Sequence, residues 1–436
     1  MSSSIRKRKS PADETTAAKR KVQSTTTKAG VANFFKPSSQ KEPEKTTWRL
    51  VDKTLLVGKY LNKPTTGEGG EGTPVQSNKI AGFDLDSTII TTKSGNKFAK
   101  SDDDWQWWHS SVPSKLQELH DKGYHLILFT NQAGIPDPTK DSTRLTTFKS
   151  KVATIFTSLD IPGITAYAAT SNDRYRKPRP GMWEECLSDL NLDAEGLDLG
   201  GSYLVGDAAG REGDFSDTDR KWALNIGLGF ITPEEFFLGQ APRAMSHKFD
   251  PSKYTIATET TATKNSVVFT KSTAKKEVVL FVGSPGAGKS TFYWRHLEPL
   301  GYERINQDIL KTKPKCFATA RDLLSAGRSV VIDNTNADRA TRAAWIALAK
   351  EHKAPIRCLY FTSSEELCMH NAAVRAFGGD IVNREKRNML PGIAFKGFKG
   401  RFEEPAEGEG FLELTKVEFI WEGEEEERKI WERFWT

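Results

Sequence analysis

A glycine-rich stretch in the second half of the chain has the residue types and spacing of a phosphate-binding loop. The apolar run Val278 to Val282 predicts a buried strand, and a Gly-x-x-x-x-Gly-Lys-Ser pattern follows it directly. In such a loop the backbone N–H groups turn toward phosphate oxygens, the lysine reaches the β- and γ-phosphates, and the serine hydroxyl binds Mg²⁺. The pattern therefore predicts an ATP site, with Ser290 as a metal ligand, built from Gly283, Ser284, Pro285, Gly286, Ala287, Gly288, Lys289, Ser290 and Thr291.

A pair of carboxylates in the first half of the chain could carry out a different phosphate chemistry. Lys79 to Phe83 predicts a buried strand, and Asp84 and Asp86 follow it two residues apart. Two carboxylates at the end of a strand can hold Mg²⁺ while one attacks phosphorus and the other works as an acid. Taken alone this is a modest signal, because acidic residues are also common in turns.

Three later segments supply the polar side chains that such a reaction also needs. Thr130 and Asn131 end one predicted strand, Lys177 stands on a loop before a predicted helix, and Asp207 ends a further short strand. Each of these residues alone has an ordinary explanation, since a hydroxyl can satisfy a turn and a lysine can belong to a basic loop. The order of all four pieces along the chain is the stronger indication.

In this order the four pieces resemble the haloacid-dehalogenase phosphatase superfamily. The resemblance implies that Asp84 is the nucleophile and that Asp86 is the general acid and base. It also implies a phosphate site of Thr130, Asn131 and Lys177, and a magnesium site of Asp84, Asp86 and Asp207. Ser87 stands where that superfamily commonly has glycine, and if the position requires a positive φ, a serine there costs free energy.

The segments after the phosphate-binding loop carry the other groups that a kinase needs. A kinase acting on an alcohol needs a carboxylate to accept the proton, and Asp308 follows a predicted strand at the substrate side. Asp333 ends the next apolar strand, as in a Walker B element. Arg375 precedes a pair of glycines and suits a lid that closes over ATP. Arg339 and Arg342 either bind phosphate or lie on a solvent-facing side of a helix.

Length and composition predict two α/β domains after an N-terminal tail. The 436 residues suffice for two domains, and a hydrophobic content of 37% fits a soluble protein with real cores. We expect a Rossmannoid, haloacid-dehalogenase-like phosphatase domain over residues 46–245, a Thr/Ser/Lys-rich linker over 246–275, and a P-loop NTPase-type kinase domain over 276–436.

Composition also argues against several other classes of protein. No apolar run approaches the roughly 20 residues needed to span a bilayer, so we expect no membrane partner. The four cysteines have no C-x-x-C spacing, which favours a reducing compartment and no structural zinc.

The net charge of +6 is carried by the first 45 residues, which hold 11 Lys/Arg against 4 Asp/Glu and are predicted to be disordered. Two basic clusters, Arg6 to Lys9 and Lys19 to Lys21, predict a bipartite nuclear-localisation signal, hence an import receptor as partner and the nucleus as compartment. A generic polybasic tail is the alternative. Nucleic-acid affinity of the remaining chain must then come from local patches rather than overall charge.

A short apolar motif follows these basic clusters. Val31, Phe34 and Phe35 would lie on one side of a single helical turn, as a groove-binding peptide requires. The motif resembles the sliding-clamp-binding peptide of replication and repair proteins, although Lys28 stands where that peptide usually has Gln. A chance aromatic pair in a tail is the alternative.

The pairing of this phosphatase with this kinase through one linker is unusual, and over roughly residues 75–436 the chain resembles the polynucleotide kinase 3′-phosphatase family of DNA end-processing repair enzymes. The resemblance implies removal of a 3′-phosphate and ATP-dependent phosphorylation of a 5′-hydroxyl at strand-break ends, with Mg²⁺ and ATP as cofactors. It implies that Asp308 activates the 5′-hydroxyl. Animal members carry a forkhead-associated domain at the N-terminus, which 45 disordered residues cannot form, so recruitment is expected to differ.

Two other functions remain open at the level of the sequence. An RNA-end or small-molecule kinase/phosphatase would carry the same motifs. A non-catalytic adaptor that binds DNA and the clamp is also conceivable if Ser87 disables one site, and it would bind ATP without turning it over.

Overall fold

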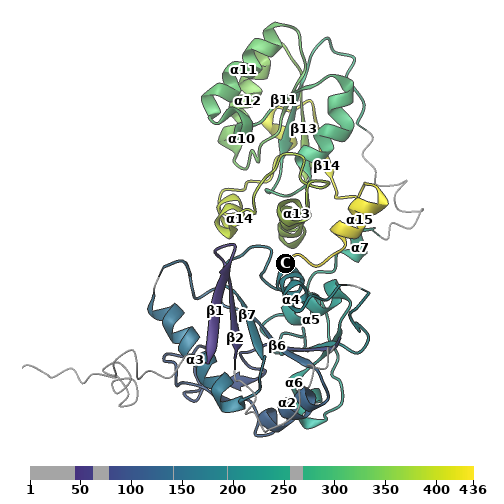
Figure 1. Cartoon of the computed structure of the whole chain (residues 1–436). Helices are drawn as coiled ribbons and strands as arrows, with labels where there is room; N and C mark the ends of the chain where they lie inside the picture. Colours follow the sequence, from purple (N-terminus) through teal and green to yellow (C-terminus); the bar gives the residue numbers. More distant parts are fainter. Residues whose placement is uncertain (1–44, 62–77, 141, 194, 256–268) are drawn as a thin grey trace, which may run out of the picture. The chain divides into compact units, whose positions relative to one another are not determined.

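The computed structural model describes residues 45–61, 78–140, 142–193, 195–255 and 269–436 (Figure 1). The tail, with its predicted nuclear-localisation and clamp-binding motifs, lies outside the described residues, so those motifs stay predictions. Every structural statement below concerns the described part of the chain.

The first domain is built on a seven-stranded sheet in the order β1-β2-β7-β6-β3-β8-β9. β1 and β2 form an antiparallel hairpin, β2 pairs antiparallel with β7, and the other neighbours are parallel. The strands are β1 (Thr46–Val51), β2 (Leu55–Tyr60), β3 (Ile80–Phe83), β6 (His125–Asn131), β7 (Thr165–Ala169), β8 (Tyr203–Val205) and β9 (Gly229–Ile231). β3 therefore lies between β6 and β8, the two other strands that were predicted to end in site residues.

Helices cover both faces of this sheet (Figure 1), which is why β3 and β7 are buried at every position. α2, α3 and α6 share one buried cluster with β3, and α4 and α5 share the cluster on the opposite face. The helices are α2 (Val112–Asp121), α3 (Thr143–Leu159), α4 (Gly181–Leu190), α5 (Thr218–Ile226) and α6 (Pro233–Leu238). A separate hairpin of β4 (Ile90–Thr91) and β5 (Gln106–Trp107) follows β3.

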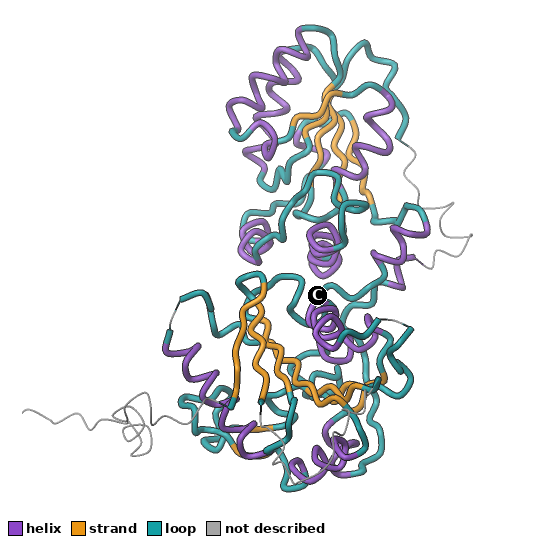
Figure 2. Tube along the Cα trace, viewed as in Figure 1, coloured by secondary structure: helices purple, strands orange, loops and turns teal. Residues whose placement is uncertain are grey.

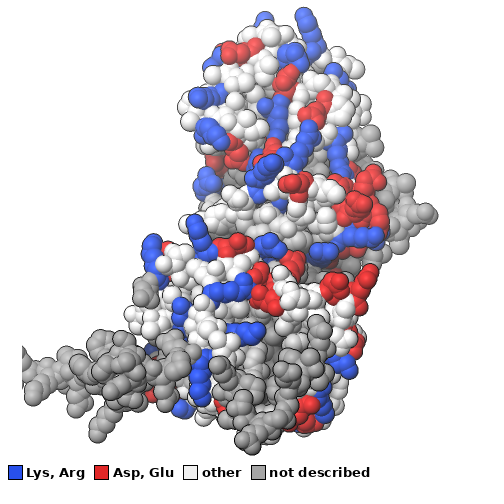
Figure 3. All heavy atoms as spheres, in the orientation of Figure 1, with Lys and Arg blue, Asp and Glu red and all other residues white. Residues whose placement is uncertain are grey.

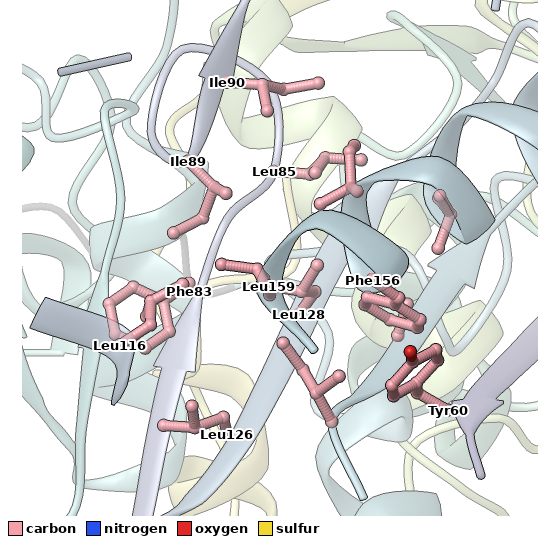
Figure 4. Packing of buried hydrophobic residues seen from close by; sticks show 14 of the residues in the cluster. Tyr60, Phe83, Leu85, Ile89, Ile90, Leu116, Leu126, Leu128, Phe156 and Leu159 are labelled. Carbon is pink, nitrogen blue, oxygen red and sulfur yellow. The ribbon is translucent and has the colours of Figure 1, made fainter. Parts of the chain in front are cut away.

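The core beneath the end of β3 is tightly filled by aliphatic and aromatic side chains (Figure 4). Phe83 and Leu85, on either side of Asp84, are both fully buried, and Leu128 and Phe156 belong to the same cluster. A carboxylate between two buried apolar side chains has little freedom to move, so packing fixes where Asp84 points.

The second domain is built on a five-stranded, all-parallel sheet in the order β11-β12-β10-β13-β14. Its strands are β10 (Val278–Val282), β11 (Glu303–Ile305), β12 (Val330–Ile332), β13 (Ile356–Phe361) and β14 (Glu413–Val417). The central strand β10 is buried at every position, and helices again flank the sheet on both sides (Figure 2).

The helices of the second domain are α9 (Lys289–Phe292), continued by a π-turn η2 (Tyr293–Leu297) and a 3₁₀ turn η3 (Glu298–Leu300), then α10 (Gln307–Leu310), α11 (Lys313–Ser325), α12 (Arg339–Glu351), α13 (Glu365–Phe377), α14 (Gly392–Lys399), the 3₁₀ turn η4 (Glu407–Glu409) and α15 (Glu425–Trp431). α11 and α12 pack on one face of the sheet, whereas η2, α13 and α14 pack on the other. Residues 378–391, between α13 and α14, begin with the two glycines after the predicted lid residue Arg375 and are called the lid segment below.

The predicted fold class, two α/β domains in this order, is confirmed. Within the predicted linker, residues 252–255 form the short helix α7 (Ser252–Thr255), and the buried Phe249 packs with Leu367 and Trp431 of the second domain. Residues 256–268 lie outside the described residues. Among the helices that are described, none has the length and apolar character needed to cross a membrane.

Candidate functional sites

The sheet of the first domain brings the predicted phosphatase residues to one edge. Phe83 of β3 pairs with Leu128 of β6 on one side and with Val205 of β8 on the other. The residues that follow these parallel strands therefore emerge side by side, at the carboxyl edge where open α/β sheets bind ligands. Asp84, Thr130 and Asp207 come from three neighbouring strands.

Lys177 reaches this edge from the loop before α4 and ties the carboxylates together. Its Nζ lies 2.5 Å from Oδ1 of Asp84 and 2.8 Å from Oδ1 of Asp219, and it donates to the carbonyl oxygen of Phe129 at 2.7 Å. The Lys177 side chain is 1% exposed, which makes it a buried cation with three oxygen partners. Because the ammonium is already desolvated, a phosphate oxygen that replaces one of these partners would require no further desolvation of the lysine itself.

The buried charges shift one another's pKa values. Burial raises the pKa of Asp84 well above its ordinary value, against the opposing effect of Lys177. Burial and the neighbouring Asp219 raise the pKa of Asp207 to about 7. Burial alone would lower the pKa of Lys177, but Asp219 and Asp84 outweigh it and raise the pKa. The cluster thus holds more negative charge than one lysine offsets.

A divalent cation fits this cluster. Ligand oxygens of Asp84, Asp207 and Asp219 lie within 4.8 Å of one another, and all are carboxylate oxygens, the donors that Mg²⁺ prefers. The predicted ligand Asp86 does not belong to this group by its side chain. The structure thus brings two of the three predicted carboxylates together and adds Asp219, which the sequence analysis missed.

Asp86 is held beside the cluster by two partners that were not predicted. Lys151 of α3 places its Nζ 3.2 Å from Oδ1 of Asp86, and Gln132 donates from Nε2 to Oδ2 at 2.9 Å. The Lys151 side chain is 9% exposed although it belongs to a helix that also carries solvent-facing residues. No sequence pattern distinguished it from a surface lysine.

The other predicted phosphate-binding residues lie next to Lys177. The hydroxyl of Thr130 is buried at the end of β6 and accepts a hydrogen bond from Gln132. Asn131 accepts from the backbone N–H of Lys177 at 3.0 Å and donates to its carbonyl oxygen at 3.2 Å. Asn131 therefore positions the lysine loop, and a direct phosphate contact of its side chain stays a prediction.

Ser87 has a φ of +66°, so the position does require the left-handed backbone that glycine adopts most easily. The backbone N–H of Ser87 donates to the carbonyl of Ile90, which closes the turn after the two aspartates. The chain forms this turn with a serine, and the turn still places Asp84 and Asp86 at the site.

The predicted phosphate-binding loop has the expected geometry in the second domain. Gly286 and Gly288 have φ values of +79° and +89°, and a Cβ on Gly286 would lie 2.1 Å from the carbonyl oxygen of Cys368. Lys289 is buried and donates to the carbonyl oxygens of Gly283 and Ser284 at 2.9 and 2.6 Å. Burial lowers the pKa of Lys289 to about 8.

Ser290 and Asp333 meet at the end of this loop, as a Walker A and Walker B pair should. The Ser290 hydroxyl donates to Oδ2 of Asp333 at 2.8 Å. Arg304 of β11, which was not predicted, donates from Nε to the same Oδ2 at 2.7 Å and from Nη2 to the Ser290 hydroxyl at 2.9 Å. The oxygen donors of Ser290 and Asp333 fit a magnesium site of the P-loop type.

Asp308 is the second residue of the short helix α10 and lines the same cleft as residues of the lid segment. Asn306 caps α10 and also donates to the backbone carbonyl of Asp333 at 2.7 Å, so α10 is fixed to the Walker B strand. The carboxylate of Asp308 is 69% exposed and is bonded by Arg387 of the lid segment. Arg387, too, was missed by the sequence analysis.

The predicted lid residue Arg375 lies at the C-terminal end of α13 and lines the same cleft as the phosphate-binding loop. Within the described part of the chain its buried Nε has no hydrogen-bond partner, and burial lowers its pKa. A buried donor without a partner in a phosphate-binding cleft is suited to an anionic ligand. The cleft has a volume of about 820 Å³ and is also lined by Asp308, Arg384 and Arg387.

Of the two arginines that the sequence left open, Arg342 is structural. It is 0% exposed and pairs with Glu409 at 2.7 Å, and it also bonds to backbone carbonyls. The backbone of Arg339, at the start of α12, bonds to Glu403. Neither contact points to phosphate binding.

Comparisons with known proteins agree with both halves of this picture. A family model described as "Polynucleotide kinase 3 phosphatase" matches residues 79–237, and one described as "AAA domain" matches residues 278–405. A bifunctional polynucleotide phosphatase/kinase of Schizosaccharomyces pombe is 41% identical over 423 residues, which cover 95% of this chain and 96% of that protein. A polynucleotide 3′-phosphatase of Saccharomyces cerevisiae is 31% identical over 208 residues, covering 37% of this chain and 87% of that protein.

The fold and the two sites define a two-domain enzyme in which a haloacid-dehalogenase-like phosphatase is followed by a P-loop kinase. The end-to-end similarity makes the assignment more specific. The chain belongs to the bifunctional polynucleotide phosphatase/kinase family.

Proposed function

We propose that this enzyme repairs DNA strand-break ends by removing 3′-phosphates at the first site and phosphorylating 5′-hydroxyls with ATP at the second. The observation that carries the proposal is that one chain holds the carboxylate cluster around Lys177 and the phosphate-binding loop, and aligns over 95% of its length with a bifunctional polynucleotide phosphatase/kinase. The adaptor alternative is disfavoured, because the turn at Ser87 forms and leaves the catalytic aspartates in place.

In the phosphatase reaction the buried Asp84 carboxylate attacks the phosphorus of the 3′-phosphate. The bond from phosphorus to the 3′-oxygen breaks, and Asp86 gives the departing oxygen a proton. Asp86 then takes a proton from a water molecule that attacks the phosphorus of the aspartyl-phosphate, which releases inorganic phosphate and restores Asp84. Lys177 holds the negative charge of the transferred group throughout, because its Nζ lies 2.5 Å from the attacking carboxylate.

In the kinase reaction Asp308 accepts the proton of the 5′-hydroxyl as its oxygen attacks the γ-phosphorus of ATP. The bond to the oxygen that bridges the β- and γ-phosphorus breaks, leaving a 5′-phosphate and ADP. Lys289 and the loop glycines hold the phosphates, and Arg375 offers its unpartnered buried donor to them.

We expect Mg²⁺ at both sites, held by Asp84, Asp207 and Asp219 in the first domain and by Ser290 with Asp333 in the second. When bound, the ion supplies positive charge that offsets the charge developing on the transferred phosphoryl group. The raised pKa values of Asp84 and Asp207 favour this assignment, since a cation would relieve the repulsion among the buried carboxylates.

A polynucleotide suits the first site better than a small phosphorylated molecule does. Phe98, in the β4–β5 loop after the catalytic aspartates, is 75% exposed, and Phe215, in the loop after Asp207, is 81% exposed. Nζ of Lys97 lies 3.7 Å from the Phe215 ring centroid and 5.7 Å from that of Phe98. Exposed aromatic rings next to a cation can stack on bases and contact a strand backbone.

The distribution of charged side chains favours recognition of the nucleic-acid strand by individual loops near the sites. Basic and acidic side chains are interspersed on the face of the described residues that Figure 3 shows, without a broad surface of one sign. Residues 46–436 hold 52 Lys/Arg against 53 Asp/Glu, so strand binding by this part of the chain should depend on loops near each site rather than on a long-range positive field.

A nicked duplex with a 3′-phosphate and a 5′-hydroxyl tests the proposal directly. It would be incubated with Mg²⁺, with and without ATP, and both ends would be followed on a gel. We expect loss of the 3′-phosphate without ATP and gain of a 5′-phosphate only with ATP. Asp84→Asn should abolish the first step alone and Lys289→Ala the second alone. If neither DNA end changes while ATP is hydrolysed, the DNA assignment is wrong.

The RNA-end alternative needs a competition experiment. Unlabelled RNA and DNA strands with identical ends would compete for a labelled DNA substrate in each reaction. DNA should compete at least as well as RNA if strand-break ends of DNA are the substrates. Stronger competition by RNA in both reactions would favour an RNA-end enzyme.

We propose further that the tail directs the enzyme to replicating nuclear DNA. The motif of Val31, Phe34 and Phe35 would dock on the sliding clamp, and the two basic clusters would bind an import receptor. Clamp binding by the full chain would be compared with that of a Phe34→Ala/Phe35→Ala variant, and unchanged binding would exclude the motif. Nuclear accumulation of the full chain should be lost when Lys19, Arg20 and Lys21 are replaced by alanine.

A further inference from the structure

A chain of ion pairs joins the nucleotide end of the kinase site to the predicted base. At one end Arg304 contacts both Asp333 and Ser290. Its Nη1 donates to Oε1 of Glu385 in the lid segment at 2.5 Å. The other oxygen of Glu385, Oε2, lies 2.6 Å from Nε of Arg387 in an ion pair without hydrogen-bond alignment, and Arg387 is in turn bonded to Asp308.

The three side chains in the middle of this series of ion pairs are largely shielded from solvent. The side chains of Arg304, Glu385 and Arg387 are 8%, 19% and 21% exposed, respectively. The lid segment also contains an ordinary surface pair for comparison, in which Arg384 lies 3.6 Å from Glu298 and the two side chains are 62% and 45% exposed. Pairs of the latter kind contribute little, whereas partly buried and geometrically close pairs constrain the groups they join.

Glu385 and Arg304, which pair in the middle of this series, are both charged at neutral pH. Burial opposes the charge on Glu385, but the hydrogen bond and the charge of Arg304 outweigh it and lower the pKa of Glu385. Burial likewise opposes the charge on Arg304, yet Asp333 and Glu385 raise its pKa. The Arg304 guanidinium is also held against the ring of Trp294, 5.1 Å from its centroid, so its orientation is fixed from two sides.

We propose that Glu385 is a positioning residue of the kinase reaction, which holds Arg304 with one carboxylate oxygen and Arg387 with the other and thereby orients Asp308 relative to the nucleotide site. The inference rests on the proposed kinase function, in which Asp308 is the base. Glu385 does not touch the reacting atoms; it acts through the two arginines.

The need for such a device follows from the position of Asp308. Its side chain is 69% exposed on a helix of four residues, so packing alone does not fix its rotamer. A base that must meet a hydroxyl at one angle loses rate when it samples other orientations. Arg387 limits the rotamers of Asp308, and Glu385 limits those of Arg387. Arg304 in turn ties Glu385 to β11, the strand that precedes α10.

The same chain of contacts links the state of the nucleotide site to the base. Arg304 touches Ser290 and Asp333, the two residues expected at the metal and the β/γ-phosphates. A change in their partners shifts Arg304, and that shift reaches Asp308 through only two further side chains. Acceptor activation would therefore respond to a correctly filled nucleotide site.

The test compares Glu385→Gln with Glu298→Gln in the full chain. Each variant removes one carboxylate charge from the partner of a lid-segment arginine, but only the first cuts the path to Asp308. For Glu385→Gln we expect the turnover rate of the kinase reaction to fall about tenfold or more, with KM for ATP within about threefold of wild type. Glu298→Gln should match wild type, and the 3′-phosphatase activity of both should be unchanged.

A second measurement follows the local stability of the lid segment and does not depend on enzymatic turnover. Hydrogen exchange of a peptide covering residues 380–390 would be followed by mass spectrometry in the absence of substrate. Its amides should exchange several-fold faster in Glu385→Gln than in wild type or Glu298→Gln, because the segment has lost its tie to Arg304. A double variant Arg304→Gln/Glu385→Gln should turn over no more slowly than Arg304→Gln alone, as expected for residues acting in one path.

The outcomes separate this inference from the function on which it rests. Wild type that does not phosphorylate a 5′-hydroxyl would contradict the proposed function. Wild-type activity together with an unchanged turnover rate and unchanged exchange in Glu385→Gln would overturn the inference alone. A rise in KM for ATP at an unchanged turnover rate would also overturn it, since Glu385 would then serve nucleotide binding rather than the base.

Discussion

Asp219 shows how a single residue can complete a site that motifs only outline. It belongs to the first turn of α5, twelve residues after Asp207 in the chain, and its carboxylate lies 2.8 Å from Nζ of Lys177. Asp219 and Asp84 both contact Lys177, and Lys177 is the only cation that pairs with either of them among the described ion pairs. The charge of Asp219 both raises the pKa of Asp207 and completes the group of three oxygens suited to Mg²⁺.

Removing the charge of Asp219 should weaken magnesium binding at the phosphatase site. We expect the Mg²⁺ concentration for half-maximal 3′-phosphatase activity to rise about 10- to 100-fold in Asp219→Asn. Kinase activity of the same protein should be unchanged and serves as an internal check on folding. Asp217→Asn is the matched control, because Asp217 is also buried and pairs with a lysine, Lys221, at 3.1 Å outside the cluster. Equal magnesium dependence of the two variants would contradict the assignment.

Ser87 is the second residue whose effect can be measured alone. Because its φ is +66°, replacement by glycine relieves backbone strain, which outweighs the greater chain entropy of glycine in the unfolded state. Ser87→Gly should therefore stabilise the phosphatase domain by about 0.5–1 kcal/mol and leave the 3′-phosphatase rate within about twofold. Urea unfolding followed by domain-specific fluorescence would measure this, and a loss of stability would show that the serine side chain makes a favourable contact.

At the scale of elements, the sequence predicted those parts of the sites that follow directly from strands. Asp84, Thr130, Asp207 and Asp333 each stand just after a short apolar run, and parallel strands carry such residues to a common edge. Four charged residues that reach the sites from helices or from the lid segment were not predicted: Lys151, Asp219, Glu385 and Arg387. Lys151 and Glu385 look like surface charges in the sequence, and only tertiary packing shows that they are partly buried and paired.

The loop between β10 and α9 tolerates no side chain at its closest approach to α13. Gly286 combines a φ of +79° with a prospective Cβ only 2.1 Å from the carbonyl oxygen of Cys368. Gly286→Ala should therefore displace the loop, abolish detectable ATP binding and 5′-phosphorylation, and leave the phosphatase reaction intact.

Gly301 provides the matched control for this loop. Its φ is +81°, but a Cβ there would meet no atom within 4 Å. Gly301→Ala should cost about 1 kcal/mol of stability through backbone strain and leave ATP affinity within about threefold, as measured by calorimetric titration. If Gly286→Ala bound ATP as tightly as Gly301→Ala, the close approach to α13 would not limit the loop.

On the scale of the whole molecule, one buried cluster gathers segments that lie far apart in the sequence. Phe249 and Tyr254, Leu367 on α13, and Trp431 on α15 pack together, and Trp435 joins them near the C-terminal residue. No sequence pattern indicates this cluster, because each segment has too few apolar residues to reveal a partner. Contacts of such long range also make the cluster a sensitive place to measure the stability of the folded chain.

His370 of α13, whose ring lies against those of Phe249 and Trp431, should make the stability of the chain depend on pH. It is 0% exposed, its Nε2 lies 2.8 Å from the carbonyl oxygen of Trp431, and its buried Nδ1 has no hydrogen-bond partner among the described residues. Burial lowers the pKa of His370 to about 4, below the ordinary value of 6.5. Between these two pH values the histidine is protonated in the unfolded chain but neutral in the folded chain.

Because the pKa is lowered in the folded state, stability is lost as pH falls from about 6.5 toward 4 and is fully present above that range. The loss can reach roughly 3 kcal/mol. In His370→Gln the side-chain amide can still donate to Trp431 but does not titrate, so the unfolding midpoint should fall less between pH 7 and pH 5 than in wild type. His109→Gln, at an exposed histidine, should keep the wild-type slope. Thermal unfolding of the three proteins at both pH values would decide the matter, since parallel slopes for wild type and His370→Gln would mean that His370 is protonated as readily in the folded chain as in the unfolded one.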